Sequence, residues 1–391
     1  MKNGDKKRIM HKEGKMRRMR VLVIGASALT LLSFAALSAD QSPWKGKIET
    51  VDGIKVIRNP NAPLFGDLKL DLQEELKIGR ADDNNYLFYR LRGLDVDVEG
   101  NIYVADMGNF RVQKFDKTGK YLLTFGRKGQ GPGEFDLPTT VHIEEKTGNV
   151  LVQDMSAIEV FAPDGKPIRA IRPEHFNRDF QIAPDGSIIA LMMISAETQT
   201  SHRLGKLASD GKVAQTFAEA PFTMYIEKRG EAVLSISTGQ ELAINFNLLD
   251  KQSVIYGYSK EYELTVADFS GKVLYRITKD ELYPKFTAKE KEGYKRIPLP
   301  EFKPYFYAIF IDNLGRIYVQ RNKTWGEEGN SQKEVDVFSK EGIFLYKTTL
   351  PKNTYIIRNG YVYTLEADEE EAIKQFKIKN WSAMKASAEE K

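Results

Sequence analysis

The side chains that could do chemistry in this chain are its histidines and acidic residues, because it contains no cysteine. The lack of cysteine excludes disulfides, thiolate nucleophiles and cysteine-ligated metals. Three histidines, His142, His175 and His202, lie outside the basic N-terminal stretch, and no two of them have the spacing of metal ligands. No Ser-His-Asp set or carboxylate pair stands out. The sequence therefore predicts no catalytic residues.

One acidic run has the spacing of a calcium loop. Asp95, Asp97, Glu99 and Asn101 are followed by Asp106 at the twelfth position of the run. An EF-hand loop lies between helices, whereas β-branched and aromatic residues flank this run and predict strands. We therefore expect turns here and no metal site of the EF-hand kind.

Three arginines recur at nearly constant separations. Arg80, Arg127 and Arg172 are 47 and 45 residues apart, and each directly follows a short apolar run. Guanidinium groups in such an array could receive a carboxylate-bearing glycan or a peptide C-terminus. The alternative is that each arginine pairs with a nearby carboxylate or packs on an aromatic ring. At the rim of the anion site we expect Lys128, His175, Arg321 and Trp325.

Residues 100–135 show which elements must position these side chains. Turn residues at 107–109 and 116–119 separate short β-rich runs, and a further run precedes them. The pattern predicts four antiparallel strands, at 94–98, 102–106, 110–115 and 121–125. We expect the carboxylate of Asp106 to act as a backbone acceptor over the 107–109 turn, and Asp154 to repeat that role in the next unit.

The motifs of this unit resemble those of a known repeat. I-Y-V-A-D, G-N-x-R-V, F-D-x-x-G-K and G-x-x-G-x-G-P-G-E-F occur in that order between residues 102 and 135. This order resembles one blade of an NHL-repeat β-propeller. The motif resemblance is strong over 94–135, and the architecture it implies covers about 68–379.

The resemblance also implies an alternative chemistry. Related six-bladed propellers include amidating lyases and calcium-dependent lactonases, whose metals lie in the central channel. Asp95, His142, Gln181 and Phe310 occupy matching inner positions here and do not make a consistent ring of ligands. For His142 we expect packing between blades.

Two series of turn glycines count the blades. Inner turns contain glycines 100, 148, 186, 315 and 360, with a degenerate turn around Lys251, and outer turns contain glycines 119, 165, 211, 271 and 342. The sixth outer turn is missing from the last blade. Residues 68–88, which align with 121–135, are expected to supply the outer strand of that blade. We therefore predict an all-β, six-bladed propeller of four-stranded antiparallel blades, its ring closed by an N-terminal strand.

The N-terminal stretch has the pattern of an export signal. Nine of the 58 basic residues and two of the 54 acidic residues lie within residues 1–20, and residues 21–39 are uncharged. We expect a signal peptide at 1–39 cleaved after Ala39, an N-terminal extension with a hairpin at 40–66, and the propeller at 67–391. An uncleaved membrane anchor is the alternative, and Met16 or Met19 could be the true start.

Charge and loop lengths complete the functional prediction. Beyond residue 20, 49 basic residues face 52 acidic ones, a net of −3, which argues against nucleic-acid binding. The second-to-third and blade-to-blade connections, which share one face, are long, and the others are short. We therefore predict a periplasmic or secreted, monomeric, non-catalytic binding or scaffolding propeller. It would recognise a protein, peptide or glycan on the long-loop face without a cofactor. The alternative is a metal-dependent hydrolase or lyase, with an ion such as calcium in the central channel.

Overall fold

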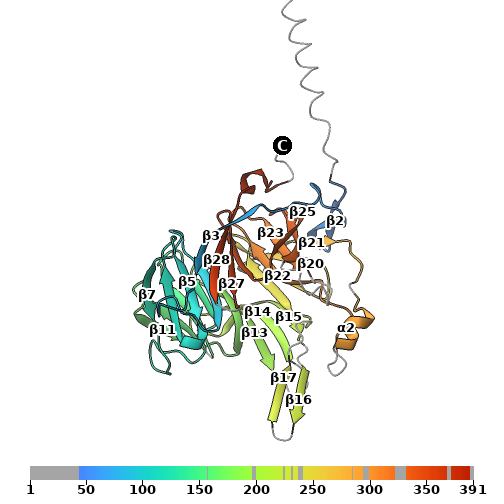
Figure 1. Cartoon of the computed structure of the whole chain (residues 1–391). Coiled ribbons are helices and arrows are strands. Elements are labelled where there is room, and N and C mark those ends of the chain that lie inside the picture. The colour runs from blue at the N-terminus through green and yellow to red at the C-terminus, as the bar shows by residue number, and fades with distance from the viewer. Residues whose placement is uncertain are drawn as a thin grey trace, which may run out of the picture. The chain divides into compact units, whose positions relative to one another are not determined.

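The computed structural model describes residues 44–155, 157–195, 200–222, 225–229, 232–236, 241–283, 285–293, 299–321, 332–367 and 371–387. Its contacts divide the chain into two units, Met1–Trp44 and Lys45–Lys391. The second unit is a ring of six mainly antiparallel sheets, five of four strands and one extended to six (Figure 1). The predicted six-bladed propeller is confirmed.

The first three blades follow one another in chain order, and each is a meander. Their strands are β4 (Leu91–Val96), β5 (Ile102–Asp106), β6 (Arg111–Phe115) and β7 (Tyr121–Phe125); β8 (Thr140–Ile143), β9 (Val150–Asp154), β10 (Ala157–Phe161) and β11 (Pro167–Ile171); and β12 (Phe176–Ile182), β13 (Ile188–Ser195), β14 (Thr200–Leu207) and β15 (Val213–Pro221).

The last three blades repeat this order with additions. Their strands are β18 (Ile244–Leu248), β19 (Ser253–Tyr258), β20 (Glu263–Asp268) and β21 (Val273–Lys279); β22 (Phe306–Ile311), β23 (Ile317–Arg321), β24 (Gln332–Phe338) and β25 (Phe344–Pro351); and β26 (Thr354–Arg358), β27 (Tyr361–Glu366), β28 (Ala372–Ile378) and β3 (Leu72–Ile78). The other elements are β1 (Lys47–Val51), β2 (Ile54–Asn59), a two-stranded hairpin of β16 (Tyr225–Arg229) and β17 (Ala232–Ile236), the helix α2 (Ala288–Gly293), and the 3-10 turns η1 (Met107–Asn109) and η2 (Trp381–Ala383). Among the described helices none is long and apolar enough to cross a membrane.

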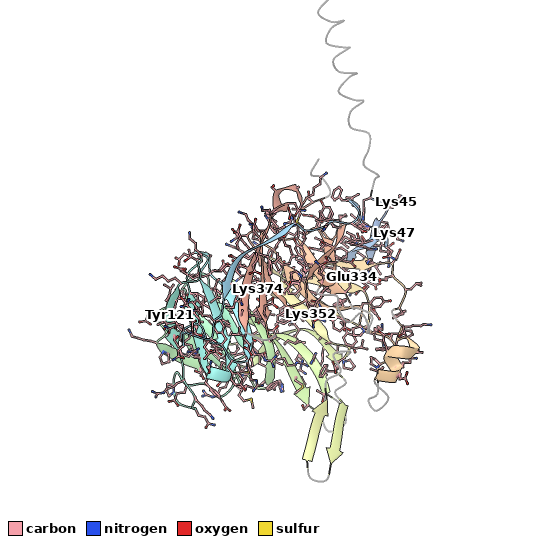
Figure 2. The ribbon with its side chains drawn as sticks, viewed as in Figure 1. Lys45, Lys47, Tyr121, Glu334, Lys352 and Lys374 are labelled. Carbon is pink, nitrogen blue, oxygen red and sulfur yellow. The ribbon has the colours of Figure 1, made fainter. Side chains whose placement is uncertain are left out.

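An N-terminal strand closes the ring, as predicted. β3 pairs antiparallel with β28, with Ile78 opposite Ile373. Lys374 Nζ lies 3.3 Å from Glu74 across this pairing (Figure 2). The last blade therefore takes its outer strand from the start of the propeller, which leaves neither strand with a free edge there.

The first inner strand lies earlier than predicted. β4 spans Leu91–Val96 rather than 94–98. The strand ends at Val96 because the Asp97 carboxylate accepts the N–H groups of Glu99 and Asn101, at 3.0 and 2.8 Å, and so forms a turn. The same hydrogen bonds give the acidic run at 95–101 a structural role, since Asp97 Oδ1 accepts N–H groups from the backbone of its own turn.

The predicted N-terminal hairpin is part of the fourth blade's sheet. β1 and β2 pair around the Asp52-Gly53 turn, and β2 continues the sheet by pairing in parallel with β21. The buried amide of Asn59 then links this blade to the fifth: it donates to the carbonyl of Gly342 and accepts from the N–H of Phe344, both at 2.8 Å.

The hydrophobic core lies between the faces of neighbouring blades. Leu94, Ile102 and Phe115 of the first blade pack against Tyr363 and Ile373 of the sixth, and all of these side chains are buried. Burying a side chain of this size contributes roughly 1.5–3 kcal/mol. Packing and hydrogen bonding together hold the six inner strands around a common centre.

Candidate functional site

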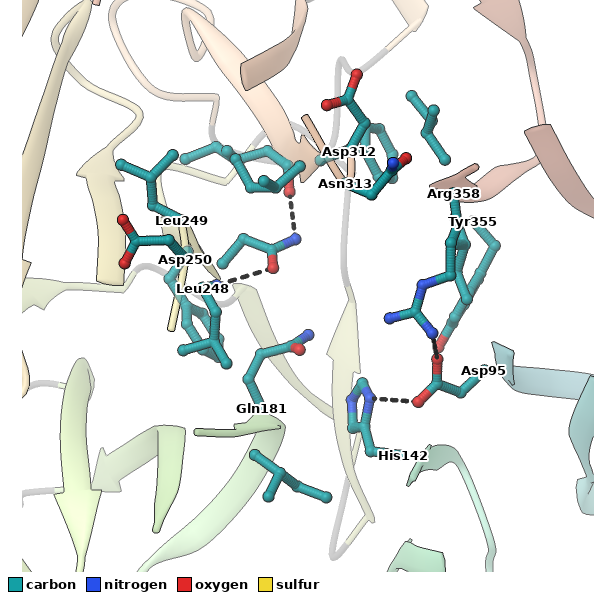
Figure 3. A pocket seen from close by; sticks show the side chains of 18 of the residues that line it. Asp95, His142, Gln181, Leu248, Leu249, Asp250, Asp312, Asn313, Tyr355 and Arg358 are labelled. Carbon is teal, nitrogen blue, oxygen red and sulfur yellow. Dashed lines mark hydrogen bonds and ion pairs between the residues drawn. The ribbon is translucent and has the colours of Figure 1, made fainter. Parts of the chain in front are cut away.

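A central pocket of about 1390 Å³ is lined by the inner strands of all six blades, β4, β8, β12, β18, β22 and β26 (Figure 3). Its lining continues into the short first-to-second turns, including Lys146, Pro184, Lys251, Gly315 and Asn359. The pocket thus reaches the face of the short turns. The sequence had placed ligand binding on the opposite face, where the long loops lie.

Asp95 joins three blades at the wall of this pocket. Its carboxylate accepts the N–H of Val96 at 2.8 Å within β4 and the N–H of Ile143 at 2.9 Å from β8. His142 Nδ1 lies 3.6 Å from one carboxylate oxygen, and Arg358 Nη1 of β26 lies 3.7 Å from the other. Burial alone would raise the pKa of Asp95, but His142 and Arg358 outweigh it and hold this pKa below its ordinary value.

Asp179 in β12 is another carboxyl group of the wall, and its environment shifts its pKa in the opposite direction, upward. Burial raises its pKa, and the nearby His142 and Arg178 offset this only in part. Its hydrogen bond within the described structure comes from the adjacent Phe180 N–H, at 2.9 Å. Burial also raises the pKa of Tyr355, and the charges of Asp179 and Asp95 add to the effect, so this phenol stays protonated.

His142 lies between these groups and packs as the sequence predicted. Its ring meets that of Phe180 edge-on, with centroids 4.9 Å apart and planes at 82°. Its Nε2 atom is buried and has no hydrogen-bond partner among the described residues. Nδ1 of the imidazole therefore faces Asp95, and Nε2 is buried.

The opposite part of the wall is more apolar. β18 and β22 contribute Phe246, Ile309 and Phe310 to it. The polar Asn247 is engaged on both sides of its amide, since it donates to the Ile309 carbonyl at 3.0 Å and accepts from the Leu248 N–H at 2.8 Å. The apolar side chains of this part of the wall thus lie on the strands, and charged residues such as Asp250 and Asp312 follow in the turns.

The inner positions singled out in the sequence meet in this pocket. Asp95, His142, Gln181 and Phe310 all line it, and each is the second-last paired residue of its inner strand. Sequence reasoning missed Asp179, Tyr355 and Arg358. Asp179 could have been found, because it lies two residues before Gln181 and side chains two apart share a strand face.

The three periodic arginines do not line this pocket. Arg80 lies 2.9 Å from Asp83 and 3.3 Å from Asp82, and its guanidinium is 4.1 Å from the ring centre of Tyr86. Arg127 pairs with Glu134 at 2.9 Å. Arg172 is exposed. Burial raises the pKa of Glu159, and the charge of Arg172 offsets part of this rise. Each arginine follows an outer strand at its own blade junction.

The expected rim residues are distributed over several blades. Lys128 Nζ lies 5.1 Å from the ring centre of Phe110, and His175 Nε2 is 3.8 Å from Glu174. Arg321 pairs with Glu281 and lies 3.6 Å from Asp336. Trp325 lies outside the described residues. Within the part of the chain that the structure describes, these side chains make no contact with one another.

Arg321 belongs to a buried charged cluster between the fourth and fifth blades. Lys279 Nζ lies 2.6 Å from Asp336 and 3.0 Å from Glu281, and the Tyr262 hydroxyl donates to Asp336 at 2.6 Å. Burial lowers the pKa of Lys279 to about 8, against the opposing effect of Asp336. Since the Lys279 side chain is fully buried, this cluster ties two blades together.

Asp106 and Asp154 occupy equivalent places at the ends of β5 and β9. Asp106 accepts the backbone N–H of Tyr89 at 2.8 Å, and its other oxygen accepts from Asn109 at 2.9 Å and from Arg111 at 2.8 Å. Asp154 accepts the N–H of Asp136 at 3.0 Å. The backbone groups bound by these carboxylates thus belong to the segment leading into each blade, and the η1 turn itself has no side-chain cap.

Across the described ranges, no group of three or more His, Cys, Asp or Glu side chains is arranged to hold a metal ion.

Known proteins share this fold. Residues 83–267 match a family described as a 6-bladed beta-propeller. The chain is 40% identical over 88 residues to rat peptidylglycine alpha-amidating monooxygenase, covering 20% of this chain and 9% of that protein. It is 30% identical over 80 residues to the Drosophila melanogaster protein brain tumor, covering 20% and 8%. The chain thus spans less than a tenth of the length of either relative.

The solved structure of a Bacteroides fragilis protein superposes on this chain with a TM-score of 0.52. That protein is described as exported on the basis of a prediction. The two chains are 11% identical, and the superposition covers 82% of this chain and 98% of the other. Such a likeness concerns the fold alone. The six-sheet ring and the matched family agree that the chain has the six-bladed β-propeller fold.

Proposed function

We propose that this protein is an exported, non-catalytic binding propeller that takes a small ligand into its central pocket. The observation that supports the proposal is a concave wall that combines polar groups from four blades with apolar side chains. Ligand sites typically combine apolar lining with a few placed polar groups and occupy about 300–1,000 Å³. A pocket of about 1390 Å³ has room for such a ligand together with water.

Binding fits the pocket better than catalysis because its central charged groups are engaged with one another. Asp95 is held by two backbone N–H groups and by His142 and Arg358. The free nitrogen of His142 is buried, so a substrate would have no access to it in this arrangement. These groups hold the inner strands in place, and the other side chains of the pocket wall contact the ligand.

Export is supported by the basic stretch at 1–20 followed by an uncharged segment at 21–39. Fractionation of the host cell tests it. We expect the protein outside the cytoplasm with its new N-terminus at Asp40, and full-length protein in the membrane fraction would instead favour the anchor.

A blocking substitution tests the binding site. Ala308 lies on β22 in the pocket wall, and Ala308→Trp should fill the channel. A ligand found by thermal shift against a metabolite and glycan library stabilises only the folded protein that binds it, and this shift should vanish in Ala308→Trp. Ala214→Trp, on the exposed side of β15, is the matched control. If the shift survives in Ala308→Trp, the ligand binds elsewhere.

Acid–base catalysis is the second candidate, because the pKa values of Asp95 and Asp179 are displaced in opposite directions within one pocket. In that case Asp179 would carry a proton and act as the acid. Turnover of a lactone or ester substrate that is lost in Asp179→Asn, with or without added calcium, would support it and would contradict a purely binding role.

A further inference from the structure

Three carboxylates of the central pocket are paired with cations, and these pairs affect the kind of ligand that the pocket favours. Asp250 lies 2.6 Å from Lys340, Asp312 lies 2.6 Å from Arg316, and Asp95 faces Arg358. Asp179, which has no such cation beside it in the described structure, sits where burial favours its uncharged form. An ionic ligand would have to compete with these pairs, whereas a neutral one would leave them intact.

Polar groups of the wall nevertheless keep hydrogen-bonding capacity. The side-chain amide of Gln181 makes no hydrogen bond to another described residue, and it offers two donors and an acceptor. The contacts of Arg358 to Val96 and Asp95 use Nη1 and leave Nε and Nη2 for other partners. Gln181 and Arg358 project toward the same open space from opposite sides (Figure 3).

The pocket wall also has apolar side chains, among which Phe310 of β22 is only partly buried. A ligand that satisfies both the polar and the apolar groups needs hydroxyl or amide groups along one edge and a C–H surface elsewhere. Sugar rings have this distribution, since their hydroxyls lie at the edge and their ring hydrogens form apolar faces.

We propose that the pocket binds a neutral, polyhydroxylated ring compound, a sugar or short oligosaccharide, with Gln181 and Arg358 bonding its hydroxyls and Phe310 packing on its face. This inference rests on the proposed channel site and names its ligand class. Gln181 is the residue to test, because it lines the pocket without holding the fold.

The experiment screens the purified protein against an array of neutral, acidic and basic glycans and titrates the strongest ligand calorimetrically at 20 and 500 mM NaCl. We expect a neutral glycan whose affinity changes less than about twofold with salt, because no ion pair forms. Gln181→Leu keeps the side-chain shape, removes its hydrogen bonds and should weaken binding about tenfold. Gln130→Leu, in an exposed loop away from the pocket, should have no effect.

Two other outcomes separate this inference from the proposed function. If the ligand is an acidic or basic glycan, binds about tenfold more weakly in high salt and is still excluded by Ala308→Trp, the channel site stands and the neutral class is wrong. If glycans bind equally to wild type, Gln181→Leu and Ala308→Trp, or none binds, the glycan inference fails. Melting temperatures of both variants within a few degrees of wild type exclude misfolding as the cause.

Discussion

His202 makes the stability of this propeller depend on pH in a way that can be worked out from its surroundings. It lies on β14 with 1% of its surface exposed, and its ring stacks on Phe222 with centroids 4.0 Å apart. Nε2 lies 2.9 Å from Arg178 Nη1, so it must accept, and the ring proton is on Nδ1. Burial, and then the charge of Arg178, lower the pKa of His202 to about 4.

The lowered pKa means that acid favours the unfolded chain. An unfolded histidine has a pKa near 6.5. Between that pH and about 4, the unfolded state binds a proton that the folded state does not, so the free energy of unfolding falls as the pH falls. Each unit of pKa difference corresponds to about 1.4 kcal/mol, so His202 alone should remove about 3 kcal/mol of stability between pH 7 and pH 4.

Urea unfolding of wild type and His202→Gln at pH 7 and pH 4 isolates this contribution, because the other titrating groups are common to both proteins. The wild type should lose about 3 kcal/mol more than the variant on acidification. His175→Gln is the matched control, since it makes the same substitution at a histidine that is only half-buried. Equal acid losses in wild type and His202→Gln would refute the reasoning, since His202 would then titrate alike folded and unfolded.

Three further predictions concern the closure of the ring, a blade clamp and the long-loop face. Deleting residues 68–79 removes β3 and exposes the edge of β28, so the protein should aggregate, and a soluble monomer with an unchanged melting temperature would contradict closure. Asp106→Ala leaves the charge of Arg111 without its partner and should lower the free energy of unfolding by about 3 kcal/mol in urea without altering calcium binding. If the long-loop face binds a carboxylate-bearing glycan in a salt-sensitive way, replacing Arg80, Arg127 and Arg172 with Gln should abolish this binding and leave the melting temperature nearly unchanged. If such binding persists or the protein unfolds, these residues are structural.

The blade count could be predicted because its causes are local in sequence. Asp116 accepts the Thr118 N–H at 2.8 Å, and Gly119 then takes a φ of +83° that glycine adopts readily. The same chemistry recurs at Asp268, which accepts the Ser270 N–H at 2.9 Å. A turn that needs only four neighbouring residues leaves its pattern in the five blades whose outer strand follows in sequence, and the sixth blade lacks it because β3 supplies its outer strand.

The polar contacts across the ring could not be predicted in this way. Asp95 and Arg358 are far apart in sequence, and their proximity depends on the last blade meeting the first. The pairing of β2 with β21 is similar, because nothing in either strand specifies a parallel partner more than 200 residues away. The central pocket arises from such long-range contacts, which the sequence does not reveal. Loop lengths can be read from the sequence, so the predicted binding surface was the long-loop face.

Equivalent positions on different blades separate what holds the ring from what it can bind. Asp106 and Asp154 have the same chemistry at the same place and do the same work, each binding backbone that leads into its blade. Asp95, His142, Gln181 and Phe310 also share one place, beside the central pocket, but have four different chemistries. At the first place, the carboxylate of these two blades holds the backbone that enters the blade. At the second place the inner strands pair equally well with any of these side chains, so this position can vary to suit a ligand.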